Sequence, residues 1–299
     1  IASCSTDLEV NADFKEETVV YGLLDASEDT QYIRITRLYQ NRNSDAFQLA
    51  QNPDSIYYNE GDLDIIVRVF DQDEIERRPV EFERIERFNK DSGIFAYPKV
   101  VLYKPKGNMN LSANNRYQLE IQNNRNGKTL SSSTRTLTGV QPQYPVSKGR
   151  INFELETIRF QWTAGINSSF YDLQIILPYT EINVRTGVET EKEVVWRVFS
   201  KVETPNVPNA LMRYDVNSRE FFAVVASSVE PNPNVVREAD SVQMIYAGGE
   251  EELLTYLEVS EPQTGIVEKK PEYSNVNNGY GIFSSRHRYK FMVKMSDSS

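Results

Sequence analysis

The chain has 299 residues and a formal net charge of −10, from 43 acidic and 33 basic side chains. Phosphate backbones repel a chain of this sign, so nucleic acid is not an expected partner. Apolar residues make up 39% of the sequence, which is enough for packed cores. No uninterrupted apolar run approaches the roughly 18 residues that a membrane-spanning helix needs.

The first four residues, Ile-Ala-Ser-Cys, place the only cysteine of the chain at position 4. Small residues before a cysteine let a signal peptidase approach the backbone, and the thiol accepts a diacylglycerol. Residues 1–4 therefore resemble the end of a bacterial lipoprotein signal peptide, with Cys4 as the acylated first residue of the mature protein. Acyl chains would then attach the protein to a membrane. The alternative is an ordinary free cysteine near a frayed terminus.

Residues 5–17 are acidic and carry few large apolar groups, which predicts a tether between the anchor and the first folded domain. From residue 18 to residue 138, apolar and polar residues alternate in short runs separated by turn residues, which is typical of a β-sandwich. Asn126-Gly127 suits a tight hairpin turn. Strands are expected at 18–24, 32–39, 63–70, 81–88, 99–103, 116–122 and 128–137.

Residues 139–149 contain two glycines and two prolines without periodicity, so this segment is the expected linker. Residues 150–299 then form a second β domain, in which a slip of phase at Thr157 predicts a bulge or a strand that changes sheet. The expected strands are 151–155, 158–162, 171–177, 194–198, 242–246 and 289–295.

Two short helices are expected within the second domain. One runs from about Ser218 to Val229, because Asn217 and Glu220 have the spacing of a capping box. The other follows Gly249, where Glu250 and the next two glutamates would lie at a positive helix end. The predicted fold is mainly β, with two β-sandwich domains of the Ig-like or fibronectin III-like type.

Catalytic motifs are absent from the sequence, which predicts that the protein is not an enzyme and needs no cofactor or metal. His287 is the only histidine and lies in a predicted strand, which disfavours a serine triad and multi-histidine zinc sites. Asp71, Asp73 and Glu74 are a candidate Ca²⁺ site, although a solvated turn is the simpler interpretation. Trp162 and Trp196 lie in phase with aliphatic residues, as in a core. Paired carboxylates for glycoside hydrolysis remain open, because sequence does not show their separation.

The C-terminal region carries a second motif, Tyr-Ser-Asn-Val-Asn-Asn-Gly-Tyr-Gly-Ile-Phe at residues 273–283. Together with Cys4 and the strand at 19–24, it resembles a family of Bacteroidetes-type outer-membrane lipoproteins of unknown function. The resemblance implies an outer-membrane location, on the periplasmic or the cell-surface face, and suggests a TonB-dependent transporter as partner. By its chemistry the segment is a turn that delivers Ile282 and Phe283 into the core. A ligand loop is the alternative, and its residues would be Asn277, Asn278, Gly279, Tyr280 and Gly281.

Downstream of this motif, the densest basic cluster alternates Arg286, Arg288 and Lys290 with other residues, as on the solvated face of a strand. Two classes of function remain open on the sequence. The first is a non-enzymatic membrane-anchored protein for binding or assembly, with a transporter or another envelope protein as partner. The second is a glycan-active protein, either a carbohydrate-binding module or a carboxylate-based hydrolase.

Overall fold

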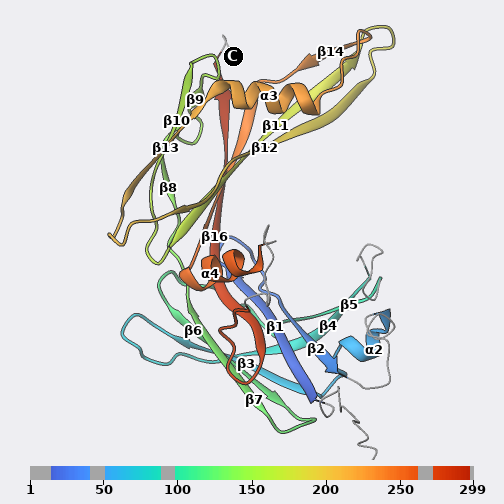
Figure 1. The fold of residues 1–299 in the computed structure, drawn as a ribbon, viewed down its shortest axis with the longest axis vertical. Helices are drawn as coiled ribbons and strands as arrows, with labels where there is room; N and C mark the ends of the chain where they lie inside the picture. The colour runs from blue at the N-terminus through green and yellow to red at the C-terminus, as the bar shows by residue number, and fades with distance from the viewer. Residues whose placement is uncertain (1–14, 41–50, 89–97, 262–271, 297–299) are drawn as a thin grey trace, which may run out of the picture.

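The computed structural model describes residues 15–40, 51–88, 98–261 and 272–296. Cys4 and most of the predicted tether therefore lie outside the described residues. The described chain is mainly β, with 53% strand and 10% helix. Its strands form two lobes, one above the other in Figure 1, joined at a narrow waist.

Seven strands and one short helix build the first lobe, and all seven strands match those expected from the alternation of apolar residues. The sheet order is β1-β2-β5-β4-β3-β6-β7. Helix α2 comprises Pro53–Ile56. The strands are β1 (Lys15–Asp25), β2 (Ile33–Gln40), β3 (Leu63–Phe70), β4 (Val80–Arg87), β5 (Val100–Pro105), β6 (Arg116–Asn123) and β7 (Thr129–Arg135).

The second lobe contains a small sheet that packs on one face of a large sheet. Trp162 in the small sheet stacks on Phe199 in the large sheet, with ring centroids 5.1 Å apart. The small sheet has the order β13-β10-β8, with β8 (Gln141–Tyr144), β10 (Thr157–Thr163) and β13 (Leu211–Asn217). The other elements are β9 (Arg150–Ile151), β11 (Phe170–Asn183), β12 (Glu189–Glu203), α3 (Ser218–Ser228), β14 (Val235–Glu238), β15 (Ser241–Gly249), α4 (Glu251–Ser260) and β16 (Tyr280–Met295).

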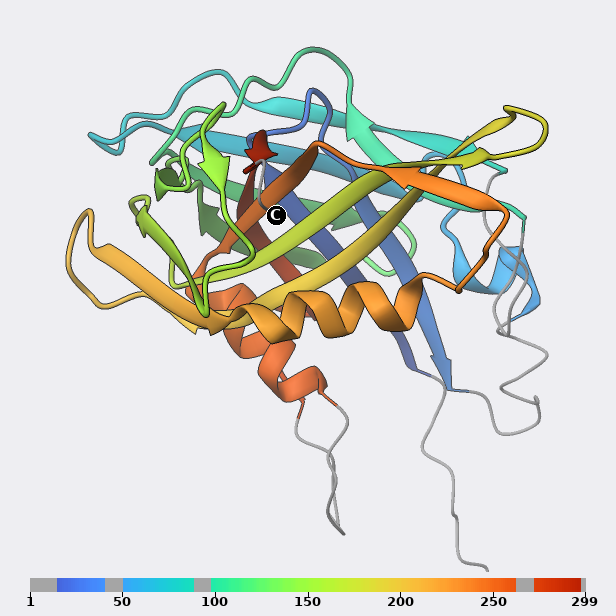
Figure 2. The same cartoon turned by 90° about the horizontal axis from the view of Figure 1, so that it is seen from above.

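Strand β16 belongs to both lobes (Figures 1 and 2). Its first half pairs in parallel with β1, from Val19↔Tyr280 to Asp25↔Arg286. Its second half pairs antiparallel with β15, as far as Gly249↔Arg286 at the waist. One mixed sheet of 13 strands therefore runs through the molecule, instead of a separate set of sheets for each predicted domain.

Several predicted elements of the second lobe differ from the observed ones. The predicted strand at 151–155 is limited to β9, and Leu155 is 51% exposed. The predicted linker 139–149 contributes β8 to the small sheet. The chain does change sheet before Thr157, since β9 pairs with β16 and β10 pairs with β13. Strand β16 begins nine residues before the predicted strand, because its first half lies in the other lobe.

The segment at residues 273–283 closes the first lobe. Ser131 of β7 and Asn277 exchange two backbone hydrogen bonds, of 2.8 and 3.4 Å. The Asn278 side chain donates to the carbonyl of Thr129 at 2.9 Å. The two edges of the first-lobe sheet, β7 and the β16 end, are thereby tied together. Phe283 enters the first-lobe core as expected, whereas Ile282 points to the opposite face and is buried under α4, because strand residues alternate.

Gly281 provides a test of this closing turn. Its φ is +102°, and a Cβ added to it would lie 2.0 Å from the carbonyl oxygen of Val20. We expect Gly281→Ala to lower the free energy of unfolding by about 3 kcal/mol, because backbone strain and a backbone clash combine. Gly107→Ala is the control, since a Cβ there meets no atom within 4 Å. Equal midpoints for the two variants in urea titrations would contradict a steric requirement for Gly281.

Candidate functional site

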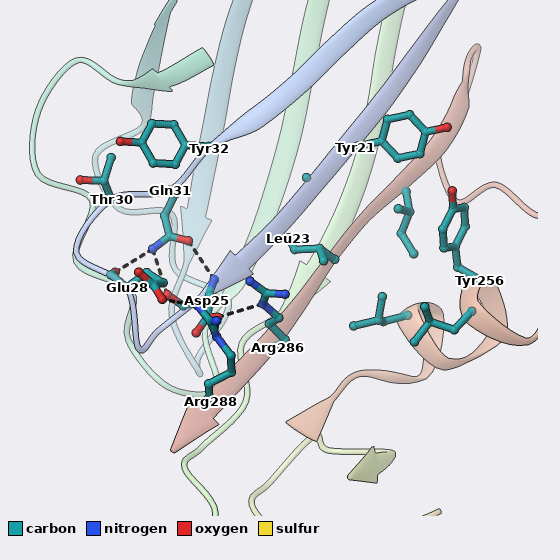
Figure 3. A pocket seen from close by; sticks show the side chains of 14 residues that line it. Tyr21, Leu23, Asp25, Glu28, Thr30, Gln31, Tyr32, Tyr256, Arg286 and Arg288 are labelled. Atoms are coloured by element: carbon teal, nitrogen blue, oxygen red, sulfur yellow. Dashed lines mark hydrogen bonds and ion pairs between the residues drawn. The ribbon is translucent and has the colours of Figure 1, made fainter. Parts of the chain in front are cut away.

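A groove follows the outer face of β1 at the waist, with α4 as its opposite wall (Figure 3). Alternation along β1 sends Val20 and Leu24 into the first-lobe core and leaves Tyr21, Leu23 and Asp25 on the outer face. Helix α4 begins directly after β15 and packs on this face through Leu253, against Ile282 and Leu23. The helix covers only part of the face, so the groove remains beside it.

Two cavities of about 530 Å³ each make up the groove. Both are lined by Tyr21 and Tyr256, whose rings meet edge to face with centroids 6.4 Å apart and an interplanar angle of 73°. Tyr21 is 41% exposed and Tyr280, in the second cavity, 44%. Burial and the neighbouring Tyr256 raise the pKa of Tyr21, so its hydroxyl stays protonated. The middle of the groove is therefore apolar and aromatic.

One end of the groove is an ion cluster centred on Asp25. The Nε atoms of Arg286 and Arg288 donate to Asp25 Oδ2 at 2.9 and 3.0 Å, and the Asp25 side chain is 3% exposed. Arg288 also pairs with Glu28. Burial would raise the pKa of Asp25, but hydrogen bonds from Ser27 and the charge of Arg286 outweigh it and lower that pKa. Asp25 is therefore an ionised structural anion.

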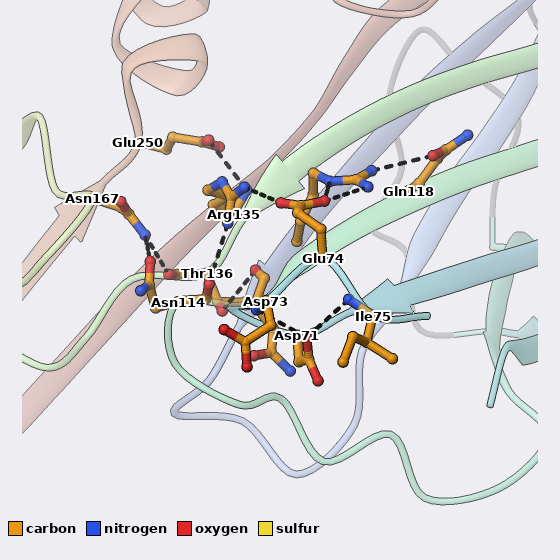
Figure 4. A network of polar contacts seen from close by, with 12 residues as sticks. Asp71, Asp73, Glu74, Ile75, Asn114, Gln118, Arg135, Thr136, Asn167 and Glu250 are labelled. Atoms are coloured by element: carbon orange, nitrogen blue, oxygen red, sulfur yellow. Dashed lines mark hydrogen bonds and ion pairs between the residues drawn. The ribbon is translucent and has the colours of Figure 1, made fainter. Parts of the chain in front are cut away.

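A second carboxylate, that of the half-buried Glu250, joins the two lobes (Figure 4). It accepts hydrogen bonds from the Thr134 hydroxyl, from the backbone N–H of Arg135 at 3.2 Å, and from the Ser284 hydroxyl at 3.1 Å. Burial raises the pKa of Glu250 above its usual range. The sequence predicted this residue as a charge at a helix end, but its side chain makes no cap hydrogen bond to α4. Its carboxylate oxygens accept hydrogen bonds from the first lobe instead.

The acidic candidates for a Ca²⁺ site form a turn between β3 and β4 (Figure 4). Asp71 Oδ1 accepts from the backbone N–H groups of Asp73 and Ile75, each at 3.0 Å. Glu74 pairs with Arg116 and Arg135, which lower its pKa. In the described part of the chain, no group of three or more His, Cys, Asp or Glu residues could hold a metal ion. The carboxylates of Asp71 and Glu74 thus have protein partners.

The remaining candidate residues from the sequence contact other parts of the fold. The turn residues Asn277 and Asn278 bond to β7, and a Cβ on Gly279 would lie 2.4 Å from Leu130. His287 is half-buried beside Gly139, and its Nδ1 has no hydrogen-bond partner. Burial lowers the pKa of His287. No described serine or threonine is hydrogen-bonded to it, so the described residues contain no triad. Trp162 and Trp196 are buried in the second-lobe core, as expected.

The groove was not predicted from the sequence. Arg286 and Arg288 were recognised as neighbours on one face of a strand, but Asp25 is 261 positions away from Arg286 along the chain. The one available signal was an acidic residue, Asp25, directly after the apolar residues of the predicted strand 18–24. Compared with known proteins, the chain matches no family model and no curated protein.

Asp25 gives a pH test of the ion cluster. Because its folded pKa lies below the unfolded value of about 3.9, its contribution to stability is present above about pH 5 and is lost as pH falls through the folded pKa. We expect Asp25→Asn to lower the free energy of unfolding at pH 7 by about 1–3 kcal/mol, since solvent partly screens the two arginines.

The difference between wild type and Asp25→Asn should shrink as the pH is lowered toward about 2. Urea titrations at several pH values measure it, with Asp73→Asn, in the exposed turn, as the matched control. A difference that stays constant with pH would contradict the assignment of Asp25 as an ionised, stabilising group.

Proposed function

We propose that the protein is a membrane-anchored lipoprotein of the bacterial cell envelope, acting at the outer membrane as a non-enzymatic component for binding or assembly. The sequence around Cys4 and the resemblance at residues 273–283 support the location. The observation that carries the binding role is the waist groove, whose middle is apolar and whose carboxylate Asp25 is already held by two arginines. The proposed partner is an envelope protein, with a TonB-dependent transporter as the first candidate.

The state of the buried carboxylates favours binding over hydrolysis. A glycosidase needs two facing carboxyl groups about 5–9.5 Å apart, one of which donates a proton. Asp25 and Glu28 in the groove are paired with arginines. Burial raises the pKa of Glu250, but three donors from the protein occupy its carboxylate between the lobes. Neither arrangement leaves a free pair for a substrate.

A glycan-binding module is the second candidate, and the exposed rings of Tyr21 and Tyr280 favour it. Tyr21 and Tyr256, however, meet at 73° and form no flat platform for stacking sugars.

The proposal includes an Ig-like or fibronectin III-like character for the lobes. The small sheet stacked on the large sheet in the second lobe supports it.

The direction of β1 gives the proposed orientation. Strand β1 begins at the end of the first lobe away from the waist (Figure 1), because its last residue, Asp25, pairs with Arg286 at the waist. Residues 5–14 would span up to about 34 Å if fully extended. A lipid on Cys4 would therefore hold the first lobe nearest the membrane and present the second lobe away from it. Among the described helices, none is long and apolar enough to cross a membrane.

Replacement of Cys4 tests the anchor. In the full precursor, we expect Cys4→Ala to move the protein from the membrane pellet to the soluble fraction, because no acyl chain can be attached. Incorporation of radiolabelled palmitate should be lost in parallel. Retention of Cys4→Ala in washed membranes would overturn the lipoprotein assignment.

A charge placed in the groove tests the binding role. Leu257 lines the first cavity and Ile75 is 55% exposed outside both cavities. We expect Leu257→Asp to reduce at least tenfold the envelope proteins recovered with the tagged protein from cross-linked intact cells, because a charge opposes apolar docking. Ile75→Asp should recover wild-type amounts. Equal recovery with both variants would show that the groove is not the binding site.

A further inference from the structure

Strand β13 forms a free edge of the small sheet in the second lobe. The sheet has the order β13-β10-β8, and among the described strands β13 pairs only with β10. It runs along the margin of the second lobe in Figures 1 and 2, and helix α3, which follows it, extends away from it along β12. A strand at a sheet edge leaves alternate backbone N–H and C=O groups without a ladder partner, so it can pair with a strand of another chain.

The hydrogen bonds at both ends of β13 show which of its backbone groups point away from β10. The N–H of Ala164 donates to the carbonyl of Ala210 at 2.9 Å, and the N–H of Ser218 donates to the carbonyl of Glu156 at 3.1 Å. Hydrogen-bonded residues alternate along an antiparallel ladder, so the even-numbered residues of β13 bond to β10. The N–H and C=O groups of the odd-numbered residues in 211–217 therefore point to the free edge.

Strand β13 lacks the features that normally protect an edge strand. It has seven residues without proline or glycine and pairs with β10 without a register shift. At the other edge of the small sheet, β8 has four residues, includes Pro142 and pairs with a register shift. The edge strands of the large sheet are β7, which is bridged by Asn277, and β12, which pairs with register shifts. Prolines, bulges and covering segments oppose strand addition, so β13 remains open to it.

Two side chains of opposite charge flank the centre of β13 on its solvent face. Arg213 and Asp215 pair with each other, and their side chains are 52% and 31% exposed. Arg159 of β10 also donates to Asp215, at 3.2 Å. Residues two apart in a strand share a face, whereas Tyr214 between them faces the core. The free edge thus presents one positive and one negative side chain, two residues apart.

A second copy of β13 in antiparallel orientation matches this pattern in one register. Outward backbone groups must face each other, so odd-numbered residues lie opposite odd-numbered residues of the second copy. With a two-fold axis at Tyr214, Arg213 of each copy lies opposite Asp215 of the other. Leu211 then lies opposite Asn217. An axis at Arg213 or at Asp215 instead places two like charges directly opposite each other, which is unfavourable.

We propose that two copies of the chain associate through β13, about a two-fold axis at Tyr214. Three strands from each copy then form one continuous sheet, in which the two β13 strands are the central pair. Each Asp215 lies between Arg159 of its own chain and Arg213 of the partner subunit. Both copies use the same edge, so the contact is isologous and the assembly closes as a dimer.

This pairing reverses the second copy end for end. Strand β13 runs from the waist side of the second lobe toward the end remote from the first lobe (Figure 1). An antiparallel partner runs the opposite way, so the two first lobes lie at opposite ends of the pair. With the anchor proposed for Cys4, such a pair would join copies on two facing membranes. The pairing itself does not depend on the anchor.

Charge reversal at the edge tests the proposal on the full chain without lipid, by sedimentation velocity. We expect wild type to form dimers at concentrations up to about 100 µM, and Arg213→Asp or Asp215→Arg alone to weaken dimerisation at least tenfold, because like charges then face each other. An equimolar mixture of the two variants should associate as wild type does, since every facing pair again has opposite charges. Arg185→Asp, at an exposed turn outside β13, should alter dimerisation less than twofold.

Leu211→Pro tests the backbone contact without a change of charge. The N–H of Leu211 points to the free edge, so proline there removes no hydrogen bond to β10. We expect Leu211→Pro to weaken dimerisation at least tenfold, while circular dichroism shows that the fold is retained. Circular dichroism of the two charge variants provides the same check.

Three results would overturn the proposal. The first is a wild-type chain that stays monomeric throughout the concentration range. The second is folded charge variants that fail to associate when mixed, because complementary charges would then not select the register. The third is dimers that survive both Leu211→Pro and the charge reversals, which would place the contact elsewhere. Leu257→Asp in the groove should leave dimerisation unchanged, so failure of the groove and failure of this proposal are read separately.

Discussion

The structure depends on a single strand, β16, that pairs in two lobes at once. Arg286 marks the crossing point, because it is the register partner of Asp25 in β1 and of Gly249 in β15. Phe283 on one side of this point enters the first-lobe core, and Phe291 on the other side enters the second-lobe core. Each lobe therefore completes its sheet with one half of the same sixteen-residue strand.

The waist follows from this crossing. Asp25 ends β1 beside Arg286, and α4 begins two residues after Gly249. A Cβ on Gly249 would lie 2.3 Å from the ring of Phe170, so this position needs glycine for close packing. The helix then lies along β1 and leaves the groove beside it. The same strand extends past the waist and pairs with β15 in the second lobe, so both lobes are parts of one sheet.

Local patterns in the sequence predicted the local elements well. The seven strands of the first lobe, and α3 with its Asn217 cap, follow from alternation and capping, which involve neighbouring residues. Strand β13 was missed although Met212, Tyr214 and Val216 alternate with polar residues and face the core. The parallel pairing of β16 with β1 was missed because it joins residues about 260 positions apart, and no local signal encodes such a partner. The groove and the ion cluster depend on that pairing, and they were missed with it.

The most direct test of the shared strand is whether a substitution that destabilises the first lobe also lowers the urea midpoint of the second lobe. Both tryptophans lie in the second-lobe core, so their fluorescence reports that lobe alone. We expect Phe283→Ala, in the first-lobe core, to lower the urea midpoint of tryptophan fluorescence and of circular dichroism together, by the equivalent of about 3 kcal/mol. Phe88→Ala, at a side chain 66% exposed, should change neither. An unchanged fluorescence midpoint beside an earlier transition in circular dichroism would contradict coupling of the lobes through β16.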